Sequence, residues 1–229
     1  CRMAAQGQNI DGVRLVQQGQ YPVAMQKFQQ ALQADPQNAD AIYNMAATLH
    51  RAAKQSNDQN MLVQAEQLYN QSLDRNPNHV EAHRGLAVLL AETNRSPQAL
   101  TLLRNWTVTS PGFSEAKVEL ARLHEELGDV NSATQQLTAA VQQDFTNSRA
   151  LTALGRLKEK SGDVGSALAV YERAIQIDRN QPQLAQRVAD LRRQYPASAP
   201  TTPGYFAGPT WTGGPATSTA SGPQNRVRY

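Results

Sequence analysis

The chain has 229 residues, a formal net charge of +3, 40% hydrophobic residues and a single cysteine. It contains no lysine and arginine run that could follow a phosphate backbone, and no apolar stretch near the ~20 residues that span a bilayer, which argues against nucleic-acid binding and a membrane-spanning helix. The length allows one or two globular domains or one repeat array, and the alanine content favours close helix packing.

The only cysteine is the first residue, Cys1, so no internal disulfide can stabilise the fold. Bacterial lipoprotein signal peptidase leaves a lipid-bearing cysteine at the start of the mature chain. We therefore expect Cys1 to be lipidated and residues 1–4 to form a short lead-in from a membrane. This predicts a lipid-anchored protein of the bacterial cell envelope, at the outer membrane or at a periplasmic or surface face. An arbitrary chain start at a cysteine is the alternative.

From residue 5 onward an apolar pattern recurs at a spacing of about 34 residues. The stretch 18–36 shows it best, because Ala24, Phe28 and Ala31 mark one helix face. Asp35 ends that helix, since a residue before a proline leaves the α region. The closing prolines of the first three units are Pro36, Pro77 and Pro111.

We predict five helix pairs, a capping helix and a tail. Their expected bounds are 5–38, 39–79, 80–113, 114–147 and 148–181 for the pairs, 182–195 for the capping helix and 196–229 for the tail. The second unit is about seven residues longer than the period. We expect its polar surplus at 50–60 to form an extended turn between its helices, with His50 exposed beside it.

The tail is rich in proline, glycine, serine, threonine and alanine, and it lacks acidic residues and a periodic apolar run. Such a composition buries too little surface to offset chain entropy, so we expect disorder in isolation. Its aromatic residues are candidate contacts with a partner, because aromatic side chains often anchor such contacts. These residues are Tyr205, Phe206, Trp211 and Tyr229. A spacer without specific contacts is the alternative.

The pattern over about 5–195 resembles the tetratricopeptide repeat family, which has small residues on both helices, one large residue on the second and a closing proline. The first unit carries this pattern in Gly12, Ala24, Phe28, Ala31 and Pro36. The departures are Trp106 in place of a small residue, and Phe145 and Arg179 in place of the closing proline. We expect the packing around Trp106 to differ from that of the family.

The resemblance implies an all-α, right-handed superhelix, or α-solenoid, whose first helices line a concave groove that binds peptides or protein segments. The expected groove residues are Asn9, Tyr43, Asn44, Arg84, Arg122, Glu125, Arg149 and Arg156. Some family members clamp the terminal carboxylate of a chaperone. This chain matches one element of that clamp with Asn44, but Glu81 and Gly85 occupy another, so that partner is disfavoured.

No catalytic constellation is visible: the sequence has no glycine-rich phosphate loop, no paired cysteines and no nucleophile–base order. His79 and His83 are four residues apart and could share a helix face. The zinc-protease spacing is absent and no third ligand is placed, so a packing role is favoured over a metal site. We expect no enzyme activity, no metal and no cofactor.

We predict a non-catalytic scaffold for protein–protein interaction, a membrane-tethered lipoprotein that presents its groove to a protein or peptide partner in an envelope complex. A small-molecule substrate is not expected. The alternative is a structural subunit that assembles with its own copies into a surface layer, filament or appendage through array and tail contacts. Light scattering at several concentrations would separate these functions.

Overall fold

The structure is a computed structural model that describes residues 2–196, so Cys1 and the four tail aromatics, Tyr205, Phe206, Trp211 and Tyr229, lie outside the described residues. Within 2–196 the chain forms eleven α-helices and no strand, which confirms the all-α prediction. Ten helices form consecutive pairs: α1 (Arg2–Gln17) with α2 (Tyr21–Ala34), α3 (Ala39–Ser56) with α4 (Gln59–Arg75), α5 (Val80–Glu92) with α6 (Ser96–Thr109), α7 (Ser114–Glu126) with α8 (Val130–Gln143), and α9 (Ser148–Lys160) with α10 (Val164–Ile177). The last helix is α11 (Pro182–Gln194).

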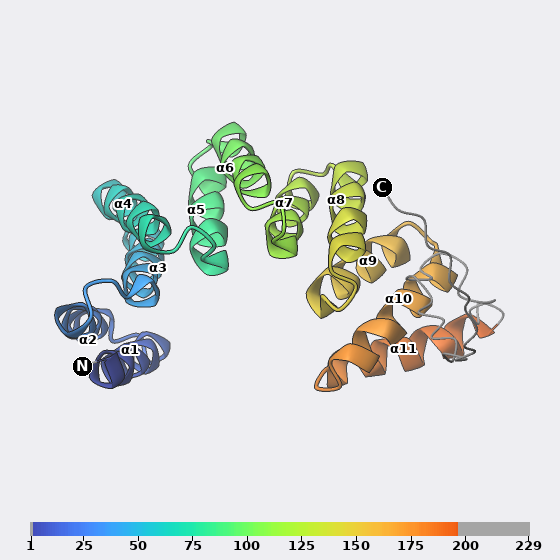
Figure 1. Ribbon diagram of the computed structural model, residues 1–229, viewed down its shortest axis with the longest axis horizontal. Helices are drawn as coiled ribbons and strands as arrows, with labels where there is room; N and C mark the ends of the chain where they lie inside the picture. The colour runs from blue at the N-terminus through green and yellow to red at the C-terminus, as the bar shows by residue number, and fades with distance from the viewer. Residues whose placement is uncertain (1, 197–229) are drawn as a thin grey trace, which may run out of the picture.

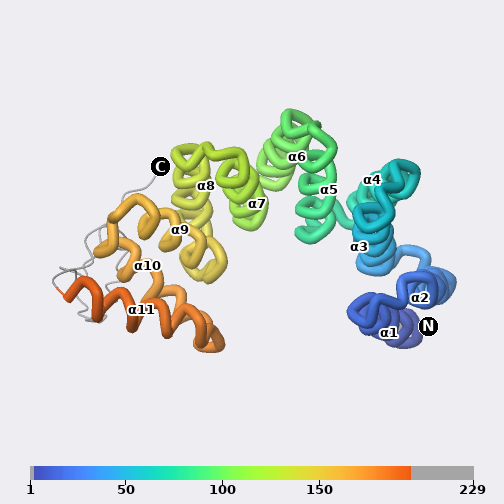
Figure 2. The backbone as a smooth tube through the Cα atoms, turned by 180° about the vertical axis from the view of Figure 1, so that it is seen from behind, coloured from blue at the N-terminus to red at the C-terminus, as the bar shows by residue number. Residues whose placement is uncertain are grey.

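The pairs stack side by side along an arc, which makes the predicted α-solenoid (Figure 1). Helices α3, α5 and α7 lie on the inner side of the arc, and α4, α6 and α8 lie on its outer side (Figure 1). The view from behind shows α1 at one end of the arc and α11 at the other (Figure 2). The first helix of each pair also contacts the first helix of the next pair, from α1 through to α9. A continuous line of first helices therefore forms the concave face.

Small residues set the close spacing of the two helices in each pair. One fully buried alanine lies at the same place on every second helix: Ala24, Ala65, Ala99, Ala133 and Ala167. In the first pair Gly12 faces Phe28, and a Cβ atom on this glycine would lie 2.4 Å from the ring. Gly155 faces Tyr171 in the same way, at 2.6 Å. These contacts leave no room for a larger residue than glycine at either position.

Asparagine and aspartate side chains cap five of the helices within 2–196, namely α3, α4, α8, α9 and α10. Asn38 and Asn147 each accept a backbone N–H of the third residue along, at 2.9 Å. Asp129 and Asp163 do the same for second helices, at 3.0 and 3.1 Å. Such caps satisfy N–H groups that have no partner inside the helix. Helices α2, α6, α7 and α11 have no side-chain cap of this kind.

The second pair contradicts the prediction of an extended turn at 50–60. Helices α3 and α4 have 18 and 17 residues, whereas α5 and α6 have 13 and 14, so the surplus lengthens both helices. Only Asn57 and Asp58 separate them: Asn57 takes a left-handed conformation at φ 54°, and Asp58 caps α4. The surplus contains alanine, lysine and glutamine, which favour helix continuation. The exposure expected for His50 was also wrong, since this residue is buried.

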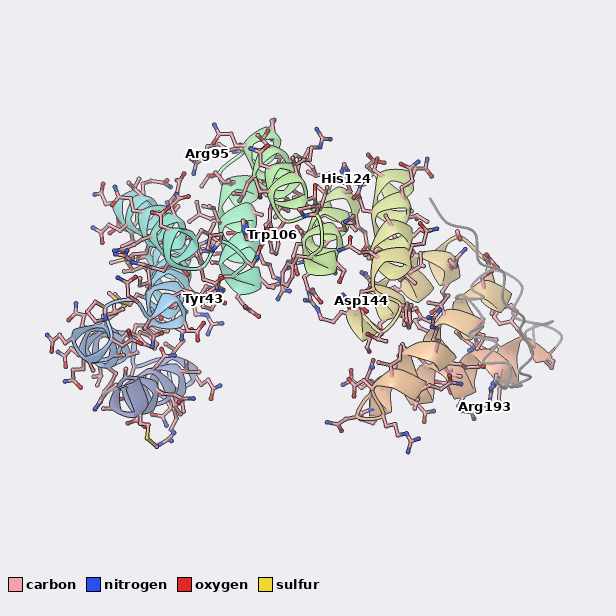
Figure 3. All side chains as sticks on the ribbon, in the orientation of Figure 1. Tyr43, Arg95, Trp106, His124, Asp144 and Arg193 are labelled. Atoms are coloured by element: carbon pink, nitrogen blue, oxygen red, sulfur yellow. The ribbon has the colours of Figure 1, made fainter. Side chains whose placement is uncertain are left out.

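The third pair accommodates Trp106 through a stack of aromatic rings. The buried indole lies between α5 and α6 and stacks on the His83 imidazole, with centroids 3.8 Å apart and planes at 11° (Figure 3). Its Nε1 donates to Asn78 Oδ1 at 2.9 Å, and the Phe113 ring lies 5.6 Å away. His83 Nε2 lies 2.9 Å from the Pro77 carbonyl oxygen and donates to it. Trp106 thus fills a position that a small residue holds in the other pairs.

The two ends of the array are built differently. Helix α1 begins at Arg2, so residues 2–4, which were expected as a lead-in, form its first turn. At the other end, Val188 and Leu191 of α11 pack against Leu168 and Tyr171 of α10. None of the helices within 2–196 combines the length and the apolar character needed to cross a bilayer.

Candidate functional site

The concave face divides into two parts with different chemistry. We call the concave side of α1 and α3 the neutral half, and the concave side of α5, α7 and α9 the charged half. The neutral half contains Asn9, Tyr43 and Asn44 of the expected groove residues. The charged half contains the other five: Arg84, Arg122, Glu125, Arg149 and Arg156.

The expected groove residues of the neutral half are amide and aromatic side chains. Asn44 Nδ2 donates to Asn9 Oδ1 at 2.9 Å and so links α3 to α1. Tyr43 lies on the side of α3 that faces α5 (Figure 3), with its ring 5.1 Å from that of His79. Burial, followed by the charge of Glu81, raises the pKa of Tyr43. The phenol therefore stays protonated at neutral pH, and its hydroxyl remains a hydrogen-bond donor.

A buried carboxylate, Glu119 of α7, organises the charged half. Arg84 of α5 donates to it through Nε at 2.9 Å and through a second nitrogen. Arg149 of α9 donates from the other side at 2.7 Å, and Arg122 lies 3.8 Å away. Burial acts to raise the pKa of Glu119, but the hydrogen bonds from Arg84 and Arg149 outweigh it and the pKa is lowered. Glu119 is therefore ionised at neutral pH and joins three successive first helices.

Further ion pairs continue this line toward the end of the array. Glu125 accepts from Arg156 at 2.9 and 2.7 Å and from Lys160 at 3.0 Å, which links α7 to α9. Glu159 of α9 accepts from Arg187 of α11, and this bond holds the pKa of Glu159 below its usual range. The charged half is thus a ladder of pairs between neighbouring repeats.

Exposure differs sharply between the two signs of charge. The side chains of Arg84, Arg149 and Arg156 are 31–52% exposed, whereas the carboxylates that they hold, Glu115, Glu119 and Glu125, are 2–21% exposed. Glu126, which pairs with Arg122 at 2.9 Å, is the more exposed exception. Apart from Glu126 and Glu81, which lies near the start of α5 with a side chain 54% exposed, a molecule that approaches the charged half therefore meets guanidinium groups first.

The expected groove residues did not include Glu119, Lys160 or Arg187, which take part in these ion pairs. A signal for Glu119 and Lys160 was present, because residues of opposite charge recur one repeat length apart on first helices. Arg84 and Glu119 are 35 residues apart, as are Glu125 and Lys160. In a solenoid, residues at this spacing lie side by side.

The histidines considered as metal ligands lie in packing positions. His79 Nδ1 accepts the Ala82 N–H at 3.3 Å, and Nε2 lies 3.1 Å from Asp40 Oδ1 without hydrogen-bond alignment. His83 stacks on Trp106, and burial lowers its pKa, so the ring is neutral at neutral pH. Across 2–196 no group of three or more histidine, cysteine, aspartate or glutamate residues could hold a metal ion.

A polar hollow of about 580 Å³ opens beside the charged half. It lies where the N-termini of α7 and α9 meet, and its lining includes Ser114, Glu115, Asn147 and Arg149. Asn147 donates to the Ser114 hydroxyl at 2.9 Å and to Glu115 at 3.0 Å. The hollow extends the polar surface that surrounds Arg149.

The two clamp positions that argued against a chaperone partner lie near the boundary of the halves. Glu81 Oε2 is 3.4 Å from His79 Nδ1. Gly85 lies under the Tyr69 ring, where a Cβ atom would be 2.5 Å from the nearest ring carbon. Neither position offers a cation to a carboxylate.

Family models match three parts of the chain. One described as TPR repeat matches residues 12–52, and two described as tetratricopeptide repeat match 57–107 and 118–183. Together these matches cover more than half of the sequence. Among curated protein sequences, none matches this chain.

Solved structures show the same fold. A thermophilic tetratricopeptide repeat protein of Thermus thermophilus is 24% identical, with a TM-score of 0.59 over 82% of this chain and 98% of its own. A tetratricopeptide repeat protein of Parabacteroides merdae is 17% identical, with a TM-score of 0.51 over 85% of this chain and 74% of its own. With five helix pairs in phase and three matching family models, the chain belongs to the tetratricopeptide repeat family.

Proposed function

We propose that this protein is a non-catalytic scaffold whose charged half binds an acidic segment of a protein partner. The exposure difference between the two signs of charge carries this proposal. Arginines of α5, α7 and α9 lie over the carboxylates that hold them, so a segment across the concave face meets cations. Arginine suits this role because its planar fork can bind two carboxylates at once.

The neutral half supports the binding of an extended chain. Amide side chains such as Asn9 and Asn44 can donate to and accept from a peptide backbone, and Tyr43 offers a half-buried ring with a hydroxyl donor. Side chains on a rigid helix array are held in place before a partner arrives, which lowers the entropy that binding costs. The two halves together fit a peptide with an acidic part and a neutral part.

Peptide binding tests this proposal. The full chain would be titrated into a labelled acidic peptide of about 12 residues and into the same peptide with glutamine and asparagine replacing the acids, with fluorescence anisotropy as the readout. We expect the acidic peptide to bind at least about tenfold more tightly, and we expect about 0.5 M salt to weaken it strongly, because screening reduces exposed pairs.

The variant for this test is Arg122→Gln with Arg156→Gln, because both side chains are exposed and their removal leaves no buried carboxylate without a partner. The matched control, Arg75→Gln with Arg104→Gln, removes the same charge from exposed positions on α4 and α6. The first variant should lose affinity for the acidic peptide and the control should keep it. Equal affinity for both peptides, or equal loss in both variants, would contradict the proposal.

We further propose that lipid on Cys1 tethers the scaffold to a bacterial envelope membrane. The support is that Cys1 directly precedes α1, which would hold the array close to a lipid carried on its thiol. Intact mass of the protein purified from its own membranes should show a diacyl or triacyl addition at Cys1. A native chain that starts at Cys1 without this addition would rule out the tether.

A further inference from the structure

The outward surfaces at the two ends of the array differ in polarity. Helix α11 turns Val188 and Leu191 inward, and its exposed residues include Arg192 and Arg193 (Figure 3). This is the polar cap that a solenoid end needs. At the other end α1 packs on α2 and α3, and nothing in the described chain covers its remaining side.

The uncovered side of α1 carries three large apolar side chains, and Arg14, whose side chain is 66% exposed, lies toward one end of it. Met3 is 87% exposed, Ile10 54% and Val13 36%, and their spacing places them on one helix face. Gly7 lies among them, and no atom lies within 4 Å of the position that its Cβ would take. On α2, α4, α6 and α10, large exposed apolar residues occur singly, as Val23, Val63, Val108 and Ile177. We call Met3, Gly7, Ile10 and Val13 the α1 face.

We propose that the α1 face pairs with the α1 face of a second copy of this chain. The two ends of the array decide between possible arrangements of copies. Docking α1 onto the α11 end of another copy would cover the ion pairs of Arg192 with Glu172 and of Arg193 with Asp190 with apolar side chains, and taking charged groups out of water without new polar contacts is unfavourable. Docking α1 onto α1 covers apolar surface with apolar surface. The resulting contact is symmetric and closes at two copies.

The order of residues on α1 is self-complementary in an antiparallel arrangement. With a two-fold axis beside Gly7, Met3 of one copy lies opposite Ile10 of the second copy, and the reverse contact follows by symmetry. Gly7 leaves a notch at the centre, where the two helices can approach closely. In this register Arg14 lies beyond the start of the second copy's α1, so its pair with Asp11 at 3.7 Å on the same helix stays at the edge of the contact.

The size of the contact predicts a weak dimer. Helix α1 has 16 residues and is about 24 Å long and 10 Å wide, which is a smaller area than the roughly 800 Å² per partner of a stable interface. We therefore expect association at tens to hundreds of micromolar rather than at nanomolar concentration.

Sedimentation equilibrium of the full chain from about 5 to 300 µM tests the pairing, with a reductant present so that no disulfide between Cys1 thiols can mimic it. The average mass should rise toward twice the monomer mass. Ile10→Glu should weaken association at least about tenfold, because it buries a charge in the contact. The control Val108→Glu changes a residue that is 76% exposed on α6 and should behave as the unchanged chain. A monomer over the whole range, or equal effects of the two variants, would overturn the proposal.

A cysteine mixing experiment tests the register. In a Cys1→Ser background, Met3→Cys and Ile10→Cys chains would be oxidised alone and as a mixture. The mixture should cross-link most, because Met3 of one copy lies opposite Ile10 of the other. Two Met3 positions, or two Ile10 positions, are about 10 Å apart along the helix axis, which is too far for a disulfide. A second arm adds phosphatidylethanolamine and phosphatidylglycerol vesicles. Suppose that the chain floats with the vesicles, that Ile10→Glu abolishes this flotation, and that the chain is monomeric without vesicles. This result would show that lipid, and not a second copy, covers the α1 face.

Discussion

The neutral and charged halves of the concave face link neighbouring first helices through different contacts. The sixth residue of α3 is Asn44 and the sixth residue of α7 is Glu119, so the two side chains occupy equivalent places. Asn44 makes one neutral hydrogen bond to the preceding first helix, whereas Glu119 receives arginines from the helices on both sides. The neutral half is therefore linked pair by pair, while in the charged half one buried carboxylate holds three repeats together.

Removing these two side chains should give the largest contrast between the halves. Glu119→Ala leaves Arg84 and Arg149 without their shared anion, and because these arginines are 31% and 49% exposed we expect a loss of about 2–3 kcal/mol of unfolding free energy. Asn44→Ala removes one neutral hydrogen bond and should cost about 0.5–1.5 kcal/mol. Urea unfolding of the full chain, followed by circular dichroism, measures both values. Similar losses in the two variants would mean that the charged half has no special coupling.

Lowering the pH should reduce the stability that Glu119 contributes to the charged half. The pKa of Glu119 is held below the usual 4.5, so the unfolded chain takes up the proton first as pH falls. The stability that its ionised form contributes is fully present above pH 4.5 and is lost as pH falls through the lowered pKa. Glu119→Gln should therefore be less stable than the unchanged chain at pH 7, by about 1–3 kcal/mol, with the gap narrowing toward pH 3. Thermal melts at pH 7, 5, 4 and 3 test this; a constant gap would contradict it.

Salt should produce the smallest effect and should sharpen the difference between the halves. Exposed pairs such as those of Arg156 and Lys160 with Glu125 contribute below about 1 kcal/mol each and are screened at about 1 M salt. Hydrogen exchange read by mass spectrometry should be modestly faster in α7 and α9 at high salt. Exchange in α1 and α3 should change less, and a uniform change along the array would argue against the division into halves.

The repeat architecture could be predicted because its signals are local and periodic. Gly12, Ala24 and Phe28 form a small–small–large pattern. This pattern lets the large ring pack directly over the glycine, and the structure contains that contact between Phe28 and Gly12. The unusual packing expected around Trp106 is also present, as a stack on His83. Such features follow from residue size and spacing alone.

The misses arise where composition is ambiguous or where contacts cross repeats. The residues at 50–60 are polar, and polarity does not distinguish an extended turn from a longer exposed helix; the positions that end the helices are Asn57 and Asp58. Because the helix continues, His50 reaches Tyr69 and Glu92 and is buried between them. Glu119 was not predicted as a site residue because its importance depends on arginines contributed by two other repeats.

The unequal length of α3 has a consequence for how the chain folds. An array of identical units has shifted arrangements, in which one pair packs as though it were its neighbour, with nearly the same energy as the native order. Helix α3 has 18 residues, whereas α5, α7 and α9 have 13 each. If α3 takes the place of another first helix, Lys54 loses its 2.6 Å contact with Glu92 and the extra turn has no matching partner. The longer second pair thus lowers the energy of the native alignment of repeats relative to the shifted alignments.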